Sequence, residues 1–192
     1  MHIGEIVWTV LIGFALVGVV GYILSTYNGL IALKNNIGRS WANIDVLLKQ
    51  RHDELPKLVK TCEGYMQHER AVFDKLSEAR GALLQAKSVG ERAEAEHMLT
   101  QALGRFFAVA EAYPDLKANQ SFLQLQARIS EIENHIADRR EFYNDTVTTF
   151  NTRIEQLPDK FIAEWLALKT AELFKVAEED RRDVDIKFAM SA

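Results

Sequence analysis

The chain has 192 residues, with 23 basic and 27 acidic side chains and a formal net charge of -4. This length allows one domain with accessory segments, and 48% of the residues are hydrophobic, which is enough for a substantial core. The nearly balanced charge argues against a nucleic-acid-binding protein, which would carry a basic patch. The single cysteine, Cys62, excludes an intramolecular disulfide and any multi-cysteine zinc site.

The segment from Ile6 to Leu24 contains nineteen residues and no charge. At about 1.5 Å per residue, a helix of this length just crosses a hydrocarbon core of roughly 30 Å. A buried core helix is one alternative, but a charge-free run of this length argues against it. A cleaved signal peptide would begin with basic residues, whereas the first five residues contain none. The sequence therefore predicts a short tail (1–5) and an uncleaved anchor (6–24) in a lipid bilayer.

The orientation of a membrane segment follows the basic residues beside it. None precedes this segment, whereas Lys34 and Arg39 follow it closely. This asymmetry predicts a single-pass protein with the bulk of the chain in the cytoplasm.

Three small residues, Gly21, Ser25 and Gly29, are four apart where the anchor ends. On a helix this spacing forms one smooth stripe against which another helix can pack closely. The stripe is a candidate face for packing between membrane helices. The alternative is that glycine is simply common in membrane helices.

Apolar residues at spacings of three and four follow the anchor, which is typical of a helix packed against other helices. They predict one long helix to about Gln85, kinked at Pro56. The alternative is a turn at residues 51–54 with a new helix opening at Pro56. Cys62 lies on this seam and is interpreted as a small buried hydrophobe, not a nucleophile. The seam contains Tyr27, Leu30, Ile37, Trp41, Ile44, Leu48, Leu55, Leu58, Cys62, Tyr65, Val72 and Leu76, with Lys34, Arg51 and Glu69 in its vacant places.

A second helix is predicted from Val89 to about Ala112. Ser88 and Glu91 have the spacing of a capping box at its start, and Pro114 ends it because the residue before a proline is disfavoured in helical geometry. Its seam contains Ala95, Leu99, Ala102, Phe106, Val109 and Tyr113.

A third helix is predicted to begin after Asn119, whose side chain can cap it, and to end before Pro158. A fourth opens at Asp159, and alternate apolar residues after Arg182 predict an extended tail (182–192). The third seam contains Phe122, Leu125, Ile129, Ile132, Ile136, Tyr143, Val147, Phe150, Ile154 and Leu157, and the fourth contains Ile162, Trp165, Leu166, Leu173 and Phe174. The fold class expected is all-α, with a single N-terminal transmembrane helix that continues into an antiparallel four-helix bundle (25–181).

Four stretches of the chain resemble the LemA family. They are "YNGLIALKNN" from Tyr27, "RHDELPKLV" from Arg51, "YPDLKANQSFLQLQ" from Tyr113 and "ENHIADRREFYNDTVTTFN" from Glu133. The resemblance implies a membrane-anchored four-helix bundle in the inner (plasma) membrane of a bacterium, without an established activity. It also implies partners among membrane proteins, including membrane-embedded proteases, and relatives that serve in membrane remodelling.

The residues that recur in this family are matched here without a catalytic role for any of them. Asn144 and Asn151 are seven apart on one stripe of the third helix, where buried amides need partners and a polar layer can specify the register of a bundle; a binding surface is the alternative. The matching residues are Tyr27, Asn28, Arg51, Pro56, Tyr113, Pro114, Asp115, Leu116, Asn119, Phe122, Glu133, Asn134, Tyr143, Asn144 and Asn151.

The sequence lacks complete motifs for catalysis or metal binding. Glu94 and His97 form one E-x-x-H, whereas a di-iron bundle needs two such motifs and further carboxylates. His68 and Glu69 begin like H-E-x-x-H, but Val72 stands where the second histidine would be. Neither a G-x-S-x-G nor a P-loop is present. The sequence therefore predicts no enzyme, no cofactor and no metal.

Two functions remain open. The first is a scaffold or adaptor that assembles with itself or with another membrane protein, such as a membrane protease. Trp41, Ile44 and Leu48 are its candidate interaction strip, because a bare apolar strip beside the membrane would mark a contact site; the alternative is that the third helix covers this strip within one chain. The second function is a ligand- or metal-binding bundle that acts as a sensor or an unrecognised enzyme.

Overall fold

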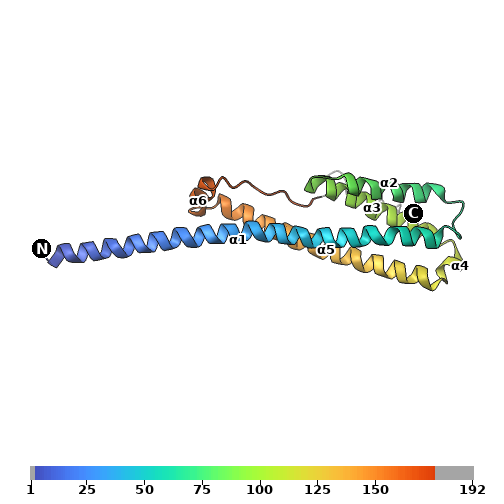
Figure 1. The fold of residues 1–192 in the computed structure, drawn as a ribbon, viewed down its shortest axis with the longest axis horizontal. Coiled ribbons are helices and arrows are strands. Elements are labelled where there is room, and N and C mark those ends of the chain that lie inside the picture. Colours follow the sequence, from blue (N-terminus) through green and yellow to red (C-terminus); the bar gives the residue numbers. More distant parts are fainter. Residues whose placement is uncertain (1–2, 176–192) are drawn as a thin grey trace, which may run out of the picture. The chain divides into compact units, whose positions relative to one another are not determined.

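The computed structural model describes residues 3–175, and this part of the chain is helical without a strand (Figure 1). The helices are α1 (Ile3–Cys62), α2 (Arg70–Gln85), α3 (Val89–Ala110), α4 (Pro114–Lys117), α5 (Gln120–Glu155) and α6 (Asp159–Trp165). The all-α class predicted from the sequence is confirmed. The extended tail predicted for residues 182–192 lies outside the described residues.

The chain divides into two compact units. Among the described residues, unit 1 contains 3–49 together with Glu133–Leu173, and unit 2 contains Gln50–Ile132 and residues 174–175. Helices α1 and α5 therefore contribute one part to each unit.

The first part of α1 is apolar and exposed on all sides. Every residue from Ile3 to Leu24 is exposed, and α1 is the one described helix that is long and apolar enough, by length and composition, to cross a membrane. Downstream, α1 also passes through Pro56 without ending, which confirms the helix predicted across that proline. Residues 6–24 thus have the composition and the exposure that a lipid-facing helix requires.

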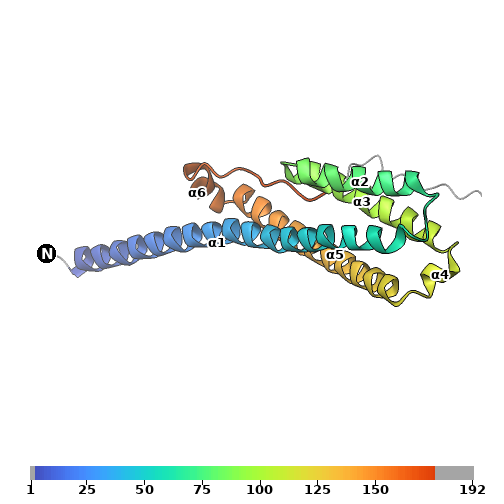
Figure 2. The ribbon, with the colours of Figure 1, turned by 45° about the vertical axis from the view of Figure 1, so that its right-hand side comes forward.

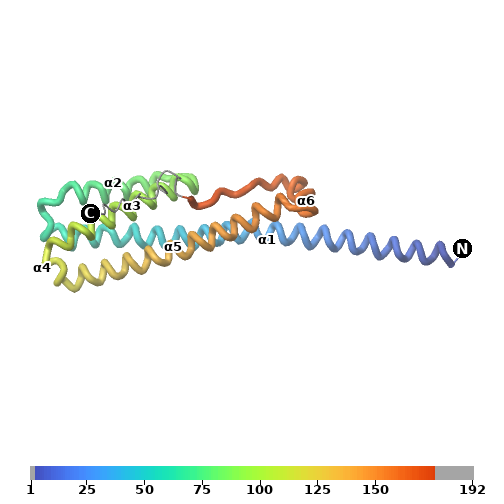
Figure 3. The backbone as a smooth tube through the Cα atoms, turned by 180° about the vertical axis from the view of Figure 1, so that it is seen from behind, coloured from blue at the N-terminus to red at the C-terminus, as the bar shows by residue number. Residues whose placement is uncertain are grey.

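Unit 1 joins the middle of α1 to the end of α5 and to α6, which lies beside both in Figure 3. Its core cluster consists of Leu30, Phe150, Ile154 and Ala163. The fourth helix predicted from the sequence is much shorter than expected, since α6 ends at Trp165. Ala167 has a φ of 49° and the amide of Leu168 donates to the carbonyl of Ala163, so the chain leaves helical geometry there. Of the predicted fourth seam, Trp165 is exposed, and Leu166, Leu173 and the buried Phe174 lie beyond the helix.

Unit 2 packs α2 and α3 side by side (Figure 2) with the last part of α1 and the start of α5. The core cluster includes Leu55, Leu58, Leu76, Leu99 and Phe106. The single helix predicted to Gln85 is wrong, because α1 ends at Cys62 and α2 begins at Arg70. Within the turn Met66 enters the core while the predicted seam residue Tyr65 is exposed. The apolar spacing persists across the turn because α1 and α2 pack against the same core.

The predicted caps are present in unit 2. The Ser88 hydroxyl accepts a hydrogen bond from the Glu91 amide, and the Glu91 carboxylate accepts one from the Ser88 amide, which is a complete capping box. The Asn119 side-chain oxygen accepts from the amides of Ser121 and Phe122 at the start of α5. Pro114 interrupts the chain where expected, but α3 has already ended at Ala110 and Pro114 opens the short helix α4.

Candidate functional site

A polar cluster lies in unit 1 where the apolar run of α1 ends. Asp159, the first residue of α6, accepts hydrogen bonds on one carboxylate oxygen from the hydroxyls of Tyr22 at 2.8 Å and Thr26 at 3.4 Å. Its other oxygen accepts from Nε of Arg153 on α5 at 2.7 Å. Three elements, α1, α5 and α6, therefore meet on one carboxylate at the boundary between apolar and polar sequence. We call these four side chains the junction cluster.

The charge of Asp159 is stabilised by its neighbours. The hydrogen bond from Arg153 has the largest effect and, with the hydroxyls of Tyr22 and Thr26, lowers the pKa of Asp159 below its ordinary value of 3.8, against a smaller opposing effect of burial. The carboxylate is consequently ionised at neutral pH and holds α6 onto α1 and α5 by charge-assisted hydrogen bonds.

Gly29 lies under the guanidinium of Arg153. A Cβ atom added at Gly29 would lie 3.1 Å from Nη2 of Arg153, so the missing side chain makes room for the junction cluster. Gly21 differs, because a Cβ added there meets no atom within 4 Å. The predicted stripe of Gly21, Ser25 and Gly29 is therefore divided: its last member packs against this chain, while Gly21 and Ser25 are exposed.

Two side chains of α5 hold the segment that follows α6. The amide of Asn151 donates to the carbonyl of Ala171 at 2.9 Å, and its oxygen accepts from the Ala171 amide at 2.8 Å. The Tyr143 hydroxyl donates to the carbonyl of Glu172 at 2.9 Å, and burial, followed by the nearby charge of Glu172, raises the pKa of Tyr143. The Asn151 side chain thus binds both the N–H and the C=O group of Ala171, as the backbone of a neighbouring β-strand would.

The strip of Trp41, Ile44 and Leu48 is not bare. Ile44 and Leu48 are buried, and the Trp41 ring lies against the Tyr143 ring of α5 with centroids 5.5 Å apart. The exposure on which the interaction strip was based is therefore absent, and the contact of Trp41 with α5 favours the alternative in which the third predicted helix covers the strip.

A buried ion pair lies in the core of unit 2. Arg51 on α1 and Glu96 on α3 have fully buried side chains, and Nη2 of Arg51 donates to Oε2 of Glu96. Nη1 of Arg51 also lies 3.4 Å from the Thr100 hydroxyl. Cys62 is buried in the same unit, and burial raises its pKa to about 12. The thiol is therefore protonated at neutral pH, as expected for a packing residue.

The stretch from Tyr113 to Phe122 connects two turns at one end of unit 2. The Tyr113 hydroxyl donates to Glu69 at 2.9 Å, and the side-chain amide of Asn119 lies 3.2 Å from the Tyr65 hydroxyl. The hydrogen bond with Glu69 is the main cause of a raised pKa at Tyr113. The turn after α1 is therefore tied to the turns around α4. Of the other matched residues here, Leu116 and Phe122 are buried, and Pro114 and Asp115 are exposed.

The remaining matched residues are spread over α1 and α5. Tyr27, Asn28 and Asn134 are exposed, whereas Glu133 and Asn144 are half-buried. The family positions therefore do not converge on one pocket within either unit. Those with contacts described above belong to the Arg51 ion pair, to the turns around α4, or to the contacts of Asn151 and Tyr143.

Sequence reasoning missed Glu96, Arg153 and Asp159 as structural partners. Glu96 carries a usable signal, since it is three residues before Leu99 and seven before Leu103, on the buried face of α3. Arg153 and Asp159 carry none, because a charged residue near a helix end is ordinarily solvated. Only the approach of α6 to α1 brings these two into one cluster with Tyr22.

Nothing among residues 3–175 points to a metal centre: the structure has no group of three or more His, Cys, Asp or Glu side chains there that could hold an ion. The imidazole Nε2 of His97 is 2.7 Å from the side-chain nitrogen of Gln101, one turn along α3, and Glu94 is exposed. The polar groups that do converge, in the junction cluster and the Arg51 pair, are partnered by this chain. These interactions join helices to one another.

The fold defines a class: all-helical proteins with one long apolar N-terminal helix. A sequence model described as the LemA family matches residues 40–188. The chain belongs to the LemA family, which confirms the resemblance drawn from its motifs.

Magnetosome and LemA proteins are similar to most of the chain. Magnetosome protein MamQ 2 of Paramagnetospirillum magneticum is 25% identical over 187 residues, covering 84% of this chain and 69% of that protein. MamQ of Magnetospirillum gryphiswaldense is 23% identical, covering 83% and 68%. Protein LemA of Metamycoplasma hominis is 28% identical over 159 residues, covering 82% and 73%.

Proposed function

We propose that this protein is a non-enzymatic scaffold or adaptor, anchored in a bacterial plasma membrane by residues 6–24 and assembled with itself or with another membrane protein. The observation that supports it most strongly is the continuity of α1, which passes without a break from an exposed apolar stretch into packed helical structure. Such a helix connects the packed part of the chain to the bilayer without an intervening loop.

The arrangement proposed for the packed part is an antiparallel four-helix bundle within residues 25–181. The order of long helices and short turns in α1, α2, α3 and α5 supports it, since short connections favour antiparallel neighbours. The excess of Lys34 and Arg39 after the anchor supports a cytoplasmic location. Both belong to the proposal, as does a membrane protease as partner. Two of the relatives are named as magnetosome proteins and one as a LemA protein, and none of these names states an enzyme activity.

The contact face proposed for assembly is the membrane helix itself. The strip of Trp41, Ile44 and Leu48 is already covered by other parts of this chain. The space beside Gly29 is filled by the Arg153 side chain. Gly21 and Ser25 stay open, and small residues four apart are what a second membrane helix needs for close approach. We therefore place self-association at Gly21 and Ser25.

The test is the mass of the full chain in mild detergent, measured by size-exclusion chromatography with light scattering. A complex larger than the 21.8 kDa chain is expected, and Gly21→Leu is expected to weaken it. Ala15→Leu is the matched control, because Ala15 lies about 120° around the helix from Gly21 at roughly 100° per residue. A monomer, or equal behaviour of the two variants, would contradict self-association at this face.

Gly29→Leu is unsuitable for this test, because the new side chain would displace Arg153 and disturb the junction cluster. The metal content of the same preparation addresses the competing function. A stoichiometric metal in the purified protein would favour a metal-binding sensor over a scaffold.

A further inference from the structure

Three large apolar side chains are exposed around α6. Leu157 is 70% exposed, Phe161 66% and Trp165 79%. Phe161 and Trp165 are four residues apart and so lie on the same face of α6, and Leu157 lies in the turn before it. The other side of α6 is buried, because Ala163 is part of the unit 1 core and Ile162 packs against it. We call Leu157, Phe161 and Trp165 the α6 apolar face.

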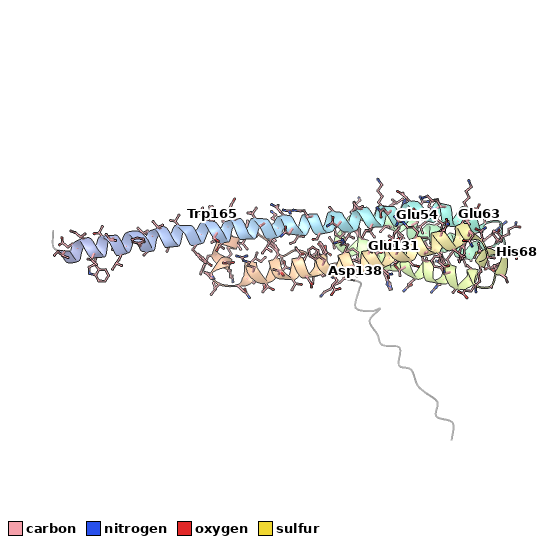
Figure 4. The ribbon with its side chains drawn as sticks, turned by 90° about the horizontal axis from the view of Figure 1, so that it is seen from below. Glu54, Glu63, His68, Glu131, Asp138 and Trp165 are labelled. Atoms are coloured by element: carbon pink, nitrogen blue, oxygen red, sulfur yellow. The ribbon has the colours of Figure 1, made fainter. Side chains whose placement is uncertain are left out.

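The position of α6 along α1 is defined by hydrogen bonds. The Tyr22 hydroxyl donates to Asp159 at 2.8 Å, and Tyr22 lies two residues before Leu24, where the predicted anchor ends. Apart from α1 itself, α6 is the part of unit 1 that extends furthest toward the N-terminus of α1 (Figures 1 and 3). In the view of Figure 4, Trp165 lies at this level along α1. The α6 apolar face therefore lies where the apolar run of α1 meets the polar part of the chain.

The chemistry of this level matches a bilayer interface. Tryptophan and other amphipathic aromatic residues concentrate where acyl chains meet headgroups. Polar side chains adjoin this face: Thr152, Arg153 and Gln156 line a depression that Leu157 borders. In water, each of the three exposed side chains would forgo about 1.5–3 kcal/mol of burial free energy. A lipid surface at this level would cover them.

We propose that the α6 apolar face inserts into the headgroup–acyl boundary of the leaflet from which α1 emerges. The occupant is the lipid bilayer, and the inference rests on the membrane anchor proposed above. Leu157, Phe161 and Trp165 then form a second attachment beside α1. Because Asp159 is bonded to Tyr22, Thr26 and Arg153, this attachment and α1 hold unit 1 in a defined orientation on the membrane.

The test uses the full chain in vesicles of phosphatidylcholine and phosphatidylglycerol that carry bromine either near the headgroups or near the ends of the acyl chains. Bromine quenches tryptophan fluorescence only at short range. The chain has three tryptophans, so the double variant Trp8→Phe with Trp41→Phe leaves Trp165 as the single reporter. We expect its fluorescence to be quenched several-fold more strongly by bromine near the headgroups than by bromine near the chain ends.

The matched control places the reporter on α5. Phe142 is 56% exposed in the same unit, eleven residues before Arg153, or roughly 16 Å away along the helix. With all three native tryptophans replaced by phenylalanine, Phe142→Trp is expected to show little quenching by either lipid. Circular dichroism checks that each variant keeps its helical content.

A third variant separates this inference from the anchor. With Trp8 as the single tryptophan, strong quenching confirms that α1 is in the bilayer. If Trp8 is quenched while Trp165 is quenched no more than the α5 reporter, the α6 apolar face is not in lipid, the anchor stands, and a protein partner is left as its occupant. Stronger quenching of Trp165 by bromine near the chain ends would contradict an interfacial position. Absence of quenching at Trp8 would overturn the anchor and this inference together.

Discussion

Arg51 and Glu96 place two opposite charges in a core that is otherwise apolar. A buried ion pair adds little net stability, because the loss of hydration offsets the attraction between the charges. The loss of one partner is different, since it leaves a charge buried without its counter-ion. The pair therefore specifies how α1 and α3 meet in unit 2 more than it stabilises them.

Glu96→Ala is expected to lower the free energy of unfolding by about 3–5 kcal/mol, because the buried Arg51 would lose the carboxylate that accepts its hydrogen bond. The double variant Arg51→Met with Glu96→Leu should recover most of this loss, since it replaces both charges with apolar groups. Urea unfolding in detergent, followed by circular dichroism, measures both. A single variant as stable as the native chain would show that the pair is solvated.

Asp159 should make the stability of unit 1 depend on pH. Because its folded pKa is lowered below the ordinary 3.8, the stabilisation is fully present above the unfolded pKa and is lost as pH falls through the folded pKa. Arg153 is 41% exposed, so solvent screening limits this contribution to about 1 kcal/mol. The melting temperature of the native chain should exceed that of Asp159→Asn at neutral pH. The difference should vanish in acid; a difference that persists there would mean that packing, not charge, is responsible.

At the scale of elements, the helix ends of unit 2 are determined by local polar chemistry. Ser88 and Asn119 satisfy backbone amides at the starts of α3 and α5, and Pro114 begins α4 at the position where its missing N–H has no cost. These signals are short in sequence and act within one turn of helix. Their positions could therefore be predicted without the tertiary structure.

Asn119→Ala should cost on the order of 1 kcal/mol, because the amides at the start of α5 lose their acceptor. Asn134→Ala is the matched control. Asn134 is exposed inside α5, where alanine is the better helix former, so this change should be neutral or slightly stabilising. Urea unfolding of the two variants in parallel gives the comparison. Equal effects would mean that Asn119 does not act as a cap.

At the scale of the whole molecule, the orientation in the membrane stays a prediction based on Lys34 and Arg39. If the packed part is cytoplasmic, an impermeant thiol reagent applied to intact cells should not label Asp138→Cys, which replaces an exposed residue of α5. After the cells are permeabilised it should be labelled. Efficient labelling of intact cells would reverse the orientation.

The native chain is the control for this experiment. Cys62 is buried and its pKa of about 12 keeps the thiol protonated, so it should stay unlabelled before and after permeabilisation and react only in denaturant. Labelling of Cys62 in the folded chain would show that its part of the unit 2 core opens to solvent.

The sequence alone was sufficient for features that depend on local periodicity and composition. The apolar run of α1, the helical class, the capping box at Ser88 and the cap at Asn119 each depend on residues within a few turns of one another. The same holds for the continuation of α1 through Pro56. The family could also be recognised from contiguous motifs, and the match over residues 40–188 confirms it.

The tertiary structure decided what depends on the approach of distant segments. The turn after Cys62 was not predicted, because α1 and α2 on either side of it pack against one core and so preserve the apolar spacing. The early end of α6 escaped prediction because Trp165 and Leu166 continue a helical pattern, although Trp165 is exposed. Glu96 is 45 residues from Arg51 along the chain. The partners of Asp159 are 6 residues away at Arg153 and 137 residues away at Tyr22. Such pairs are formed only when the helices pack, so the sequence does not show which residues pair, even where apolar spacing marks Glu96 as a buried position.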